Sequence, residues 1–178
     1  IFVIPILTLA QQDRYNIETL LADLQTIPGE VICIFNNEDV FKRLRHHPRI
    51  DKFAYNKTNA GVSRSWNIGI NLSESDTVFI LNSDLHIGPA AVAQLEHYLY
   101  HLPKAVLVAP QGSYVDFTQM RVIQYFQKGQ FSSPVKTHDV SGFLFAIHMR
   151  RYNENKLRFD TRYSPCFMEE WDMGVQVM

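Results

Sequence analysis

An acidic side chain directly follows the apolar run Thr77–Leu81, in the segment Asn82-Ser83-Asp84. A carboxylate at the end of a buried strand lies at the rim of a sheet, beside the oxygens of Asn82 and Ser83. Such hard oxygen donors suit Mg²⁺ or Mn²⁺, which take one or two protein carboxylates and share phosphate oxygens with a ligand. Asp84 is therefore a candidate cation ligand. Asn, Ser and Asp also favour plain turns, and the spacing alone leaves that alternative open.

The segment Asn59–Ile70 predicts a tight loop that enters a helix. Asn59 and Gly61 suit the loop, and Arg64 falls in the first helical turn. Backbone N–H groups at a helix start, together with a guanidinium, can bind a diphosphate. An ordinary capped helix with Trp66 in the core is the alternative.

Three carboxylates are clustered near the end of the chain, at Glu169, Glu170 and Asp172. Glu169 and Asp172 are three residues apart and share one face of a helix, while Trp171 can anchor the other side. A general base needs such a carboxylate near a nucleophile in a partly dry cleft. Acidic residues are also common at any helix start, because they interact favourably with the helix dipole. A solvated helix start is therefore the alternative.

Histidine and cysteine patterns point to no separate metal centre. The seven histidines lack metal-ligand spacing. His97 and His101 share a helix face and are expected to be structural, whereas His86 lies on the predicted rim, where it could contact a phosphate or the metal. Cys33 and Cys166 cannot form a disulfide framework, and they favour a reducing, intracellular setting.

Apolar runs alternate with amphipathic stretches through the first two-thirds of the chain. We expect strands over 1–9, 31–35, 52–55, 77–81 and 105–109, and helices over 14–25, 40–45, 61–72 and 90–100. Asp13 is the expected N-cap of the first helix. This alternation predicts an α/β fold with a mostly parallel sheet and helices on both faces. Beyond residue 113, longer strands over 120–127 and 140–148, with a polar loop over 128–137, predict a mixed sheet.

Ligands of open α/β sheets bind beyond the carboxyl ends of the strands. Polar residues follow four of the expected strands, at Thr8, Asn36–Asp39, Asn56–Gly61 and Asn82–Asp84. The sequence thus predicts that these polar groups converge on one rim.

Composition excludes several classes of protein. The chain has 178 residues, 46% of them hydrophobic and 20% charged, which is typical of a globular domain. Its formal charge of −1 gives no basic field, so no nucleic-acid partner is expected. No stretch approaches the ~18 apolar residues of a transmembrane segment, and Ile1–Leu9 does not resemble a signal peptide. We expect a cytoplasmic protein, with peripheral attachment to a membrane left open.

Taken in order, these segments resemble the GT-A-fold nucleotide-sugar glycosyltransferases, in particular the large inverting family of rhamnosyl-, glucosyl- and N-acetylhexosaminyltransferases. The likeness spans nearly the whole chain. The segments that carry it are Phe2-Val3-Ile4-Pro5 (first strand), Asn59-Ala60-Gly61 and Asn67-Ile68-Gly69-Ile70 (N-x-G and N-x-G-I), Leu81-Asn82-Ser83-Asp84 (D-x-D in its L-N-x-D form), Ser141–Arg151 (S-G through R-R), Phe159-Asp160 (F-D) and Glu169–Met173 (E-D-x-D-L). The fold implied is a Rossmann-like, GT-A-type sheet flanked by helices.

The resemblance implies a role for each matched residue. On the donor side, Asp84 would bind Mn²⁺ or Mg²⁺, and the other residues would contact the nucleotide-sugar: Pro5, Thr8 and Asn36 at the base, Asn59, Gly61 and Arg64 at the ribose and diphosphate, and Asn82 and Ser83 near the ribose or sugar. On the acceptor side, Glu170 would be the base, with Asp172 and Glu169 positioning it or the acceptor.

The implied reaction is one in-line displacement with inversion, from a UDP- or dTDP-sugar to a hydroxyl of a glycan or lipid-linked acceptor, as in polysaccharide biosynthesis. We expect a single domain over 1–178, with residues 1–110 binding the nucleotide-sugar and 111–178 forming the acceptor side. The chain starts without Met and stops at Met178 in a helical pattern, so we expect the acceptor side to be incomplete at its C-terminal end.

The sequence departs from the family pattern at several positions. Asn36 and Glu170 each stand where the family usually has Asp, and the family's downstream Arg and metal-contacting His would lie beyond Met178. These departures keep a second function open, a non-catalytic domain that binds nucleotide-sugar or glycan. A sugar nucleotidyltransferase is disfavoured, because Leu7–Arg14 contains no glycine-rich loop.

Overall fold

The apolar runs of the sequence form the strands of a six-stranded sheet. Its spatial order is β3 (Lys52–Tyr55), β2 (Val31–Phe35), β1 (Phe2–Ile6), β4 (Thr77–Leu81), β9 (Leu144–His148) and β5 (Leu107–Val108). The pairs β1–β2, β1–β4 and β2–β3 are parallel, whereas β9 pairs antiparallel with β4 and with β5. The structure, a computed structural model, describes residues 1–9, 14–126 and 129–178. The sheet is mixed and mostly parallel, as the sequence predicts.

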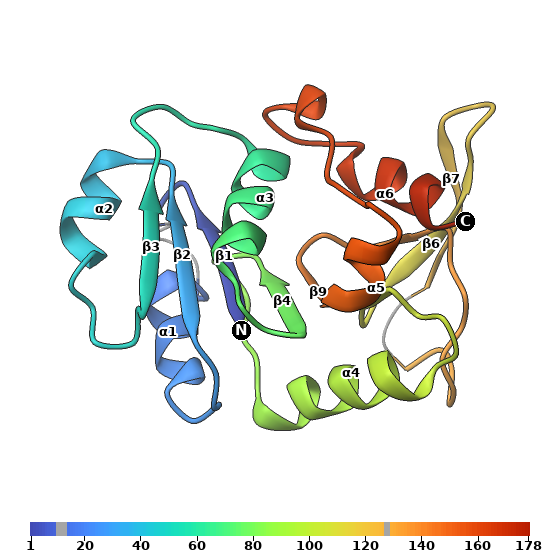
Figure 1. Ribbon diagram of the computed structural model, residues 1–178, viewed down its shortest axis with the longest axis horizontal. Helices are drawn as coiled ribbons and strands as arrows, with labels where there is room; N and C mark the ends of the chain where they lie inside the picture. Colours follow the sequence, from blue (N-terminus) through green and yellow to red (C-terminus); the bar gives the residue numbers. More distant parts are fainter. Residues whose placement is uncertain (10–13, 127–128) are drawn as a thin grey trace.

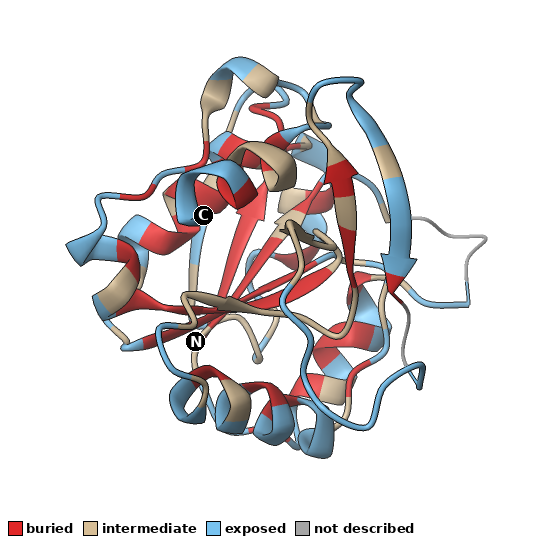
Figure 2. Cartoon of the chain, turned by 90° about the vertical axis from the view of Figure 1, so that its right-hand side faces the viewer, coloured by how far each residue is buried: buried red, intermediate tan, exposed pale blue. Residues whose placement is uncertain are grey.

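Helices cover both faces of this sheet (Figure 1). Phe2, Ile4 and Ile6 point to the face that holds α1 (Ile17–Leu24), α2 (Glu38–Leu44) and α4 (Pro89–His101). Val3 points to the other face, with α3 (Val62–Leu72), α5 (Met149–Glu154) and α6 (Glu169–Val177). Strand side chains alternate between the two faces of the sheet, so each strand contributes side chains to both hydrophobic layers. Figure 2 shows the buried strands between helices whose inward faces are buried and whose outward faces are exposed.

A second sheet of three strands lies beside the first, in the order β7 (Arg121–Phe126), β6 (Gly112–Asp116) and β8 (Asp139–Val140). All its pairs are antiparallel. Helix α6 packs so closely on β8 that a methyl group at Gly174 would collide with the carbonyl oxygen of His138. The second sheet and α6 therefore form one packed unit.

The expected strand over 140–148 is wrong as a single element. Its first residue, Val140, belongs to β8 in the small sheet, and Leu144–His148 form β9 in the main sheet, with Ser141–Phe143 between them. Ser141 N–H donates to Gln111 O, and Phe143 O accepts from Asn82 N–H, so this link is held from both sides. Strand β6, helix α5 and the short 3₁₀ turn η1 (Thr161–Tyr163) are elements that the sequence pattern did not indicate.

Several element ends also differ from expectation. Helix α1 begins at Ile17 because Asn16 caps it: the Asn16 side chain accepts from the N–H groups of Glu18 and Thr19. The expected cap, Asp13, lies outside the described residues. Strand β1 ends at Ile6, and β5 contains only Leu107–Val108.

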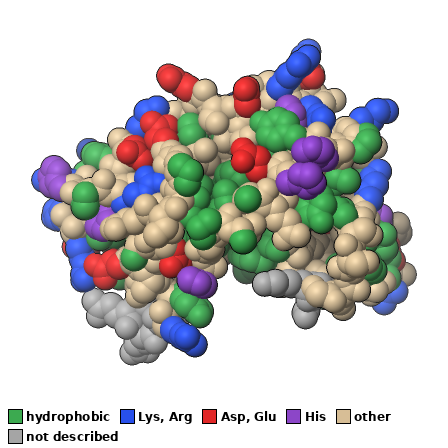
Figure 3. All heavy atoms as spheres, turned by 90° about the horizontal axis from the view of Figure 1, so that it is seen from below, with side chains coloured by type: hydrophobic (Ala, Val, Ile, Leu, Met, Phe, Trp, Pro, Cys, Tyr) green, Lys and Arg blue, Asp and Glu red, His purple; other side chains and the backbone are tan. Residues whose placement is uncertain are grey.

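Charge is dispersed over the surface. Figure 3 shows Lys and Arg side chains spread around one face, with Asp and Glu between them, in line with the near balance of 17 basic and 18 acidic residues. Among residues 1–9, 14–126 and 129–178, no helix combines the length and apolar content needed to cross a membrane.

Candidate active site

A pocket of about 360 Å³ opens beyond the carboxyl ends of β1, β2 and β4. We call it the rim pocket. The sequence-predicted residues that line it are Pro5, Thr8, Asn36, Asn59, Gly61, Asn82, Ser83 and Asp84. The remaining lining residues are Ile6, Leu7, Val62, Trp66, Pro165 and Cys166. The structure thus brings these polar groups together at one rim of the sheet, as the sequence predicts.

Asn36 organises one wall of the rim pocket. Its buried side chain accepts from Asn56 Nδ2 at 3.0 Å and from Ala60 N–H at 3.1 Å, and donates to Ser65 Oγ at 2.9 Å. These bonds tie the end of β2 to the loop before α3 and to α3 itself. The Asn36 amide therefore holds the loop that carries Asn59, and both its oxygen and its nitrogen are already engaged within the protein.

The start of α3 is closed by a segment distant in sequence. Gly61 has φ +78°, and a methyl group there would lie 2.6 Å from Ser164 Oγ and 2.8 Å from Pro165 O. Val62 N–H, the first amide of α3, donates to Pro165 O at 2.7 Å. The first helical amide that the sequence assigned to a diphosphate is thus occupied by a protein carbonyl. Pro165 and Cys166 line the rim pocket as a result.

Asp84 is the acidic residue at the mouth of the rim pocket. Its side chain is exposed and has no hydrogen-bond or ion-pair partner among the described residues. The described ranges contain no cluster of three or more His, Cys, Asp and Glu that could hold a metal unaided. One carboxylate beside the oxygens of Asn82 and Ser83 fits a cation that takes its other ligands from phosphates and water.

Two other predicted rim groups point elsewhere. Arg64 lies on α3 but is exposed and does not line the rim pocket. His86 Nδ1 lies 2.7 Å from Asp23 Oδ2, and its ring stacks on Tyr15. One ring nitrogen of His86 is thus engaged by α1, and His86 does not line the rim pocket, so its contact with a phosphate or the metal stays a prediction.

Glu170 is the half-buried carboxylate near the start of α6. A methyl group at Gly142 would collide with Glu170 Oε1 and would lie 3.2 Å from Trp66 Cη2, so the carboxylate and the Trp66 ring flank the same glycine. Trp66 in turn lines the rim pocket. Burial, and then the nearby charge of Glu169, raises the pKa of Glu170 to about 7, against hydrogen bonds from backbone N–H groups including that of Gly142. Its protonation therefore changes near neutral pH.

Glu169 is more deeply buried, with 3% of its surface exposed. Burial raises the pKa of this carboxyl as well, although backbone N–H groups of Glu169 and Phe167 donate to it. Its Oε2 has no hydrogen-bond partner among the described residues. Glu169 does not line the rim pocket.

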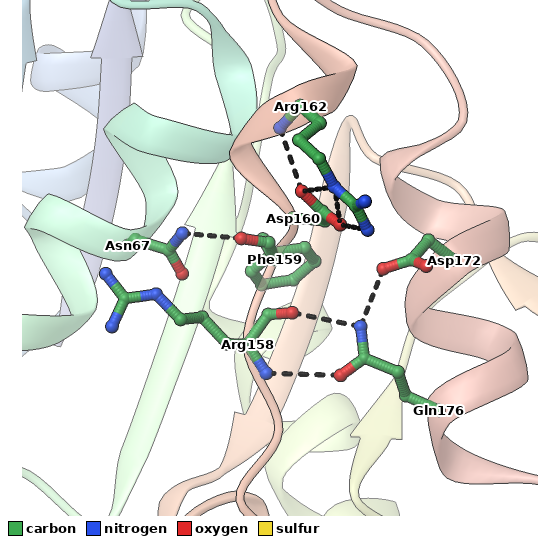
Figure 4. Close-up of polar contacts among 7 residues, drawn as sticks. All are labelled: Asn67, Arg158, Phe159, Asp160, Arg162, Asp172 and Gln176. Carbon is green, nitrogen blue, oxygen red and sulfur yellow. Dashed lines mark hydrogen bonds and ion pairs between the residues drawn. The ribbon is translucent and has the colours of Figure 1, made fainter.

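Asp172 is held by a polar network that joins α6 to α3 (Figure 4). Gln176 Nε2 donates to Asp172 Oδ2 at 2.6 Å and to Arg158 O at 3.0 Å, and Gln176 Oε1 accepts from Arg158 N–H. Asn67 Nδ2 on α3 donates to Phe159 O at 2.7 Å. We call Arg158–Asp160 the strap, because it is bonded to both helices.

A second hollow of about 300 Å³ lies along α6. We call it the apolar hollow. It is lined by Phe117, Met120, Tyr163, Met168, Trp171, Asp172 and Val175. The sequence indicated Trp171 as an anchor for α6, and apolar residues over Tyr163–Met173 as a surface for a tail, a lipid-linked acceptor or a partner chain. It gave no signal for Phe117 or Met120, which come from the chain between β6 and β7.

Comparison with known proteins identifies the fold. No protein-family model matches the chain, and no curated protein matches it. Among solved structures, GalNAc-T7 with UDP, GalNAc and Mn²⁺ matches 99% of this chain and 40% of its own length, with a TM-score of 0.72 and 12% identity. S. aureus TarS 1-349 with UDP matches 99% of this chain and 54% of its own, with a TM-score of 0.67 and 13% identity.

A further TarS structure, in complex with UDP-GlcNAc, has a TM-score of 0.66 and 12% identity, again over 99% of this chain and 52% of its own length. The chain spans less than two thirds of each of these proteins. At these identities the likeness establishes architecture: the chain has a GT-A glycosyltransferase fold, as the sequence motifs indicated.

Proposed function

We propose that this chain carries the donor site and part of the acceptor site of a metal-dependent, inverting glycosyltransferase. The observation that carries the proposal is the rim pocket, which brings together Asn59, Gly61 and Asn82 with Asp84, an exposed acid that has no partner among the described residues. The likeness to GT-A structures that contain UDP, UDP-GlcNAc and Mn²⁺ supports a UDP-sugar as donor. The transferred sugar and the acceptor are left unassigned by this likeness.

The donor side and the acceptor side would each have a carboxylate. Asp84 would hold Mn²⁺ or Mg²⁺ with Asn82 and Ser83 beside it, and a bound cation would neutralise charge on the departing diphosphate. Pro5, Thr8 and Asn36 would contact the base, and Asn59, Gly61 and Arg64 the ribose and diphosphate.

Glu170 would accept the proton of the acceptor hydroxyl. The raised pKa makes this carboxylate a stronger base than an exposed glutamate, and it is ionised above pH about 7. Asp172 and Glu169 would position the base or the acceptor. A non-catalytic domain that binds nucleotide-sugar or glycan is the second candidate, and it is supported by Asn36 and Glu170, which stand where the family usually has Asp.

The test is calorimetric titration of UDP, dTDP and GDP, each with and without Mn²⁺. We expect UDP to bind in a Mn²⁺-dependent way, and Asp84→Ala to weaken that binding at least tenfold. Glu74→Ala is the matched control, because Glu74 is an exposed acid at the opposite end of β4. If no nucleotide binds with Mn²⁺ present, or if Asp84→Ala behaves like Glu74→Ala, the proposal fails.

A further inference from the structure

Trp66 lies between the rim pocket and Glu170. Its indole lines the rim pocket, whereas Glu170 does not. Beside Gly142, a single added methyl group would collide with Glu170 Oε1 and would lie 3.2 Å from Trp66 Cη2. The carboxylate and the second ring of the indole are therefore neighbours across a glycine that has no side chain to separate them.

Packing alone holds the indole in this position. Trp66 is 1% exposed, and its ring meets those of Phe145 and Phe159 edge to face, with centroids 5.3 Å and 4.8 Å apart. Trp66 Nε1 is buried and has no hydrogen-bond partner among the described residues. Close-packed core rings of this kind keep one rotamer, so the edge of the indole that faces Glu170 is fixed.

The unpartnered N–H is a cost of having tryptophan at this position. A buried donor without an acceptor lowers stability, and phenylalanine would bring no such donor into the core. What the indole adds over a phenyl ring is its second ring, and Cη2 of that ring reaches Gly142 and Glu170. The part of the side chain that core packing explains least is thus the part that faces the carboxylate.

The other groups around Glu170 leave room for such a role. Glu169 on the same helix and Asp139 on β8 act on Glu170 through their charge, and the N–H groups of Glu170 and Gly142 donate to it. Burial comes before the charge of Glu169 among the causes that raise the pKa of Glu170. An indole packed against a carboxyl group excludes water from it, and proteins raise the pKa of an acid in this way.

We propose that Trp66 is a positioning residue for the acceptor side: its indole separates Glu170 from the rim pocket, which is open to water, and keeps the carboxylate dry. The inference rests on the proposed function for its meaning in catalysis. The contact that it invokes exists in the chain without nucleotide, so it can be tested independently. Trp66 would act on proton transfer through Glu170.

The test follows the Glu170 carboxyl group itself, by NMR titration of protein with isotope-labelled glutamate Cδ. The signal that Glu170→Gln removes identifies this group, and we expect its midpoint at a pH of about 7 in the wild type. Trp66→Phe deletes the ring that carries Cη2, so the midpoint should fall by at least about one pH unit. Phe145→Leu is the matched control, because it alters a buried ring that packs on Trp66, and it should keep the midpoint.

A second measurement leaves the indole in place. The chain has two tryptophans, so Trp66 is the only one left in Trp171→Phe. Its emission should change with a midpoint at a pH of about 7, and adding Glu170→Gln should abolish that change. An unchanged midpoint in Trp66→Phe, an equal fall in Phe145→Leu, or emission that does not depend on Glu170 would overturn the inference.

Failure of the proposed function would be seen in other measurements. UDP–Mn²⁺ titration reports on the rim pocket, and the pH midpoint of UDP release from UDP-sugars should fall in Trp66→Phe together with the NMR midpoint. If the NMR midpoint falls but no nucleotide binds, Trp66 keeps Glu170 dry and the proposed function fails. If nucleotide binds and the NMR midpoint does not move, the inference alone fails.

Discussion

The carboxylates of the rim pocket and of α6 stand in opposite surroundings. Asp84 is exposed to water and has no protein partner among the described residues, whereas Glu169 and Glu170 are packed against the protein interior. A carboxylate that receives a cation can stay in water, because the ligand brings the compensating charge and its own oxygens. A carboxylate that accepts a proton near neutral pH must be partly dry, because burial raises its pKa.

The two regions are also held in place by different means. Hydrogen bonds centred on Asn36 fix the wall of the rim pocket. Close packing at Gly142 fixes Glu170, and Gln176, which is itself bonded to the strap, holds Asp172. Substitutions in the two regions should therefore affect different properties of the protein.

Glu170→Gln should separate the regions most strongly. Removing the proposed proton acceptor is expected to lower sugar transfer by about 10³, within the 10²–10⁴ range of general-base catalysis. UDP binding should stay within about twofold, because Glu170 does not line the rim pocket. Release of UDP from UDP-sugars measures the first effect and calorimetry the second. Glu154→Gln, at an exposed acid on α5, is the control. An unchanged transfer rate would favour the non-catalytic candidate.

Gly142→Ala should disturb the α6 side through packing alone. The added methyl group would displace the Glu170 carboxylate, and a shift of about 1 Å at a reacting group can cost about 10² in rate. Overpacking should also lower the free energy of unfolding by about 1–3 kcal/mol. In Gly88→Ala the new methyl group meets no heavy atom of the described residues within 4 Å, so this control should change both quantities little. Equal activity of the two variants would contradict the packing role.

The pH dependence should have opposite signs for activity and stability. Transfer is expected to fall about tenfold per pH unit below about 7, where Glu170 becomes protonated. Folding favours the protonated carboxyl, so its stabilising contribution is complete below the ordinary pKa of 4.5 and is lost as pH rises to about 7. The loss is about 3 kcal/mol. Urea unfolding at pH 5 and pH 8 should show a larger loss in the wild type than in Glu170→Gln, which keeps the contribution of buried Glu169. Identical pH dependence in both would refute the assignment.

Asn36→Ala should weaken the rim pocket through its frame. The amide of Asn56, the N–H of Ala60 and the hydroxyl of Ser65 would each lose a buried partner, which predicts a loss of about 2 kcal/mol in unfolding free energy. UDP binding should weaken with it. Asn71→Ala, at an exposed residue of α3, is the control, and thermal unfolding is the measurement. A stability equal to that of the control would show that the network contributes little.

The rim pocket was largely predictable from sequence because strand ends are local signals. The apolar run before Asn82-Ser83-Asp84 indicates both the strand and the polar residues that follow it. Parallel strands place such endings at one edge of the sheet. The same reasoning missed Pro165 and Cys166. They reach the pocket through the approach of the 164–166 segment to Gly61, a contact between residues far apart in sequence.

The α6 side was predictable in composition but not in environment. The acidic cluster was evident, yet nothing near Glu170 in sequence indicates that Gly142 and Trp66 surround it. The break between β8 and β9 was missed because Val140 was joined to the apolar run that follows Ser141-Gly142, while the partner strands of the two pieces lie in different sheets. Strand register and burial of this kind arise from tertiary packing, which the local sequence pattern does not indicate.

The strap has a consequence for how substrates would meet. Asn67 and Gln176 bond it to α3, at the rim pocket, and to α6, which carries Glu170. The spacing between the rim pocket and Glu170 is therefore set by hydrogen bonds within the fold, and the proposed reaction would need no rigid-body closure of one half on the other. Selectivity for the acceptor would then depend on the constant distance between the rim pocket and Glu170. A longer sugar at the reacting end of the acceptor would be excluded, whereas a change far from that end would not matter.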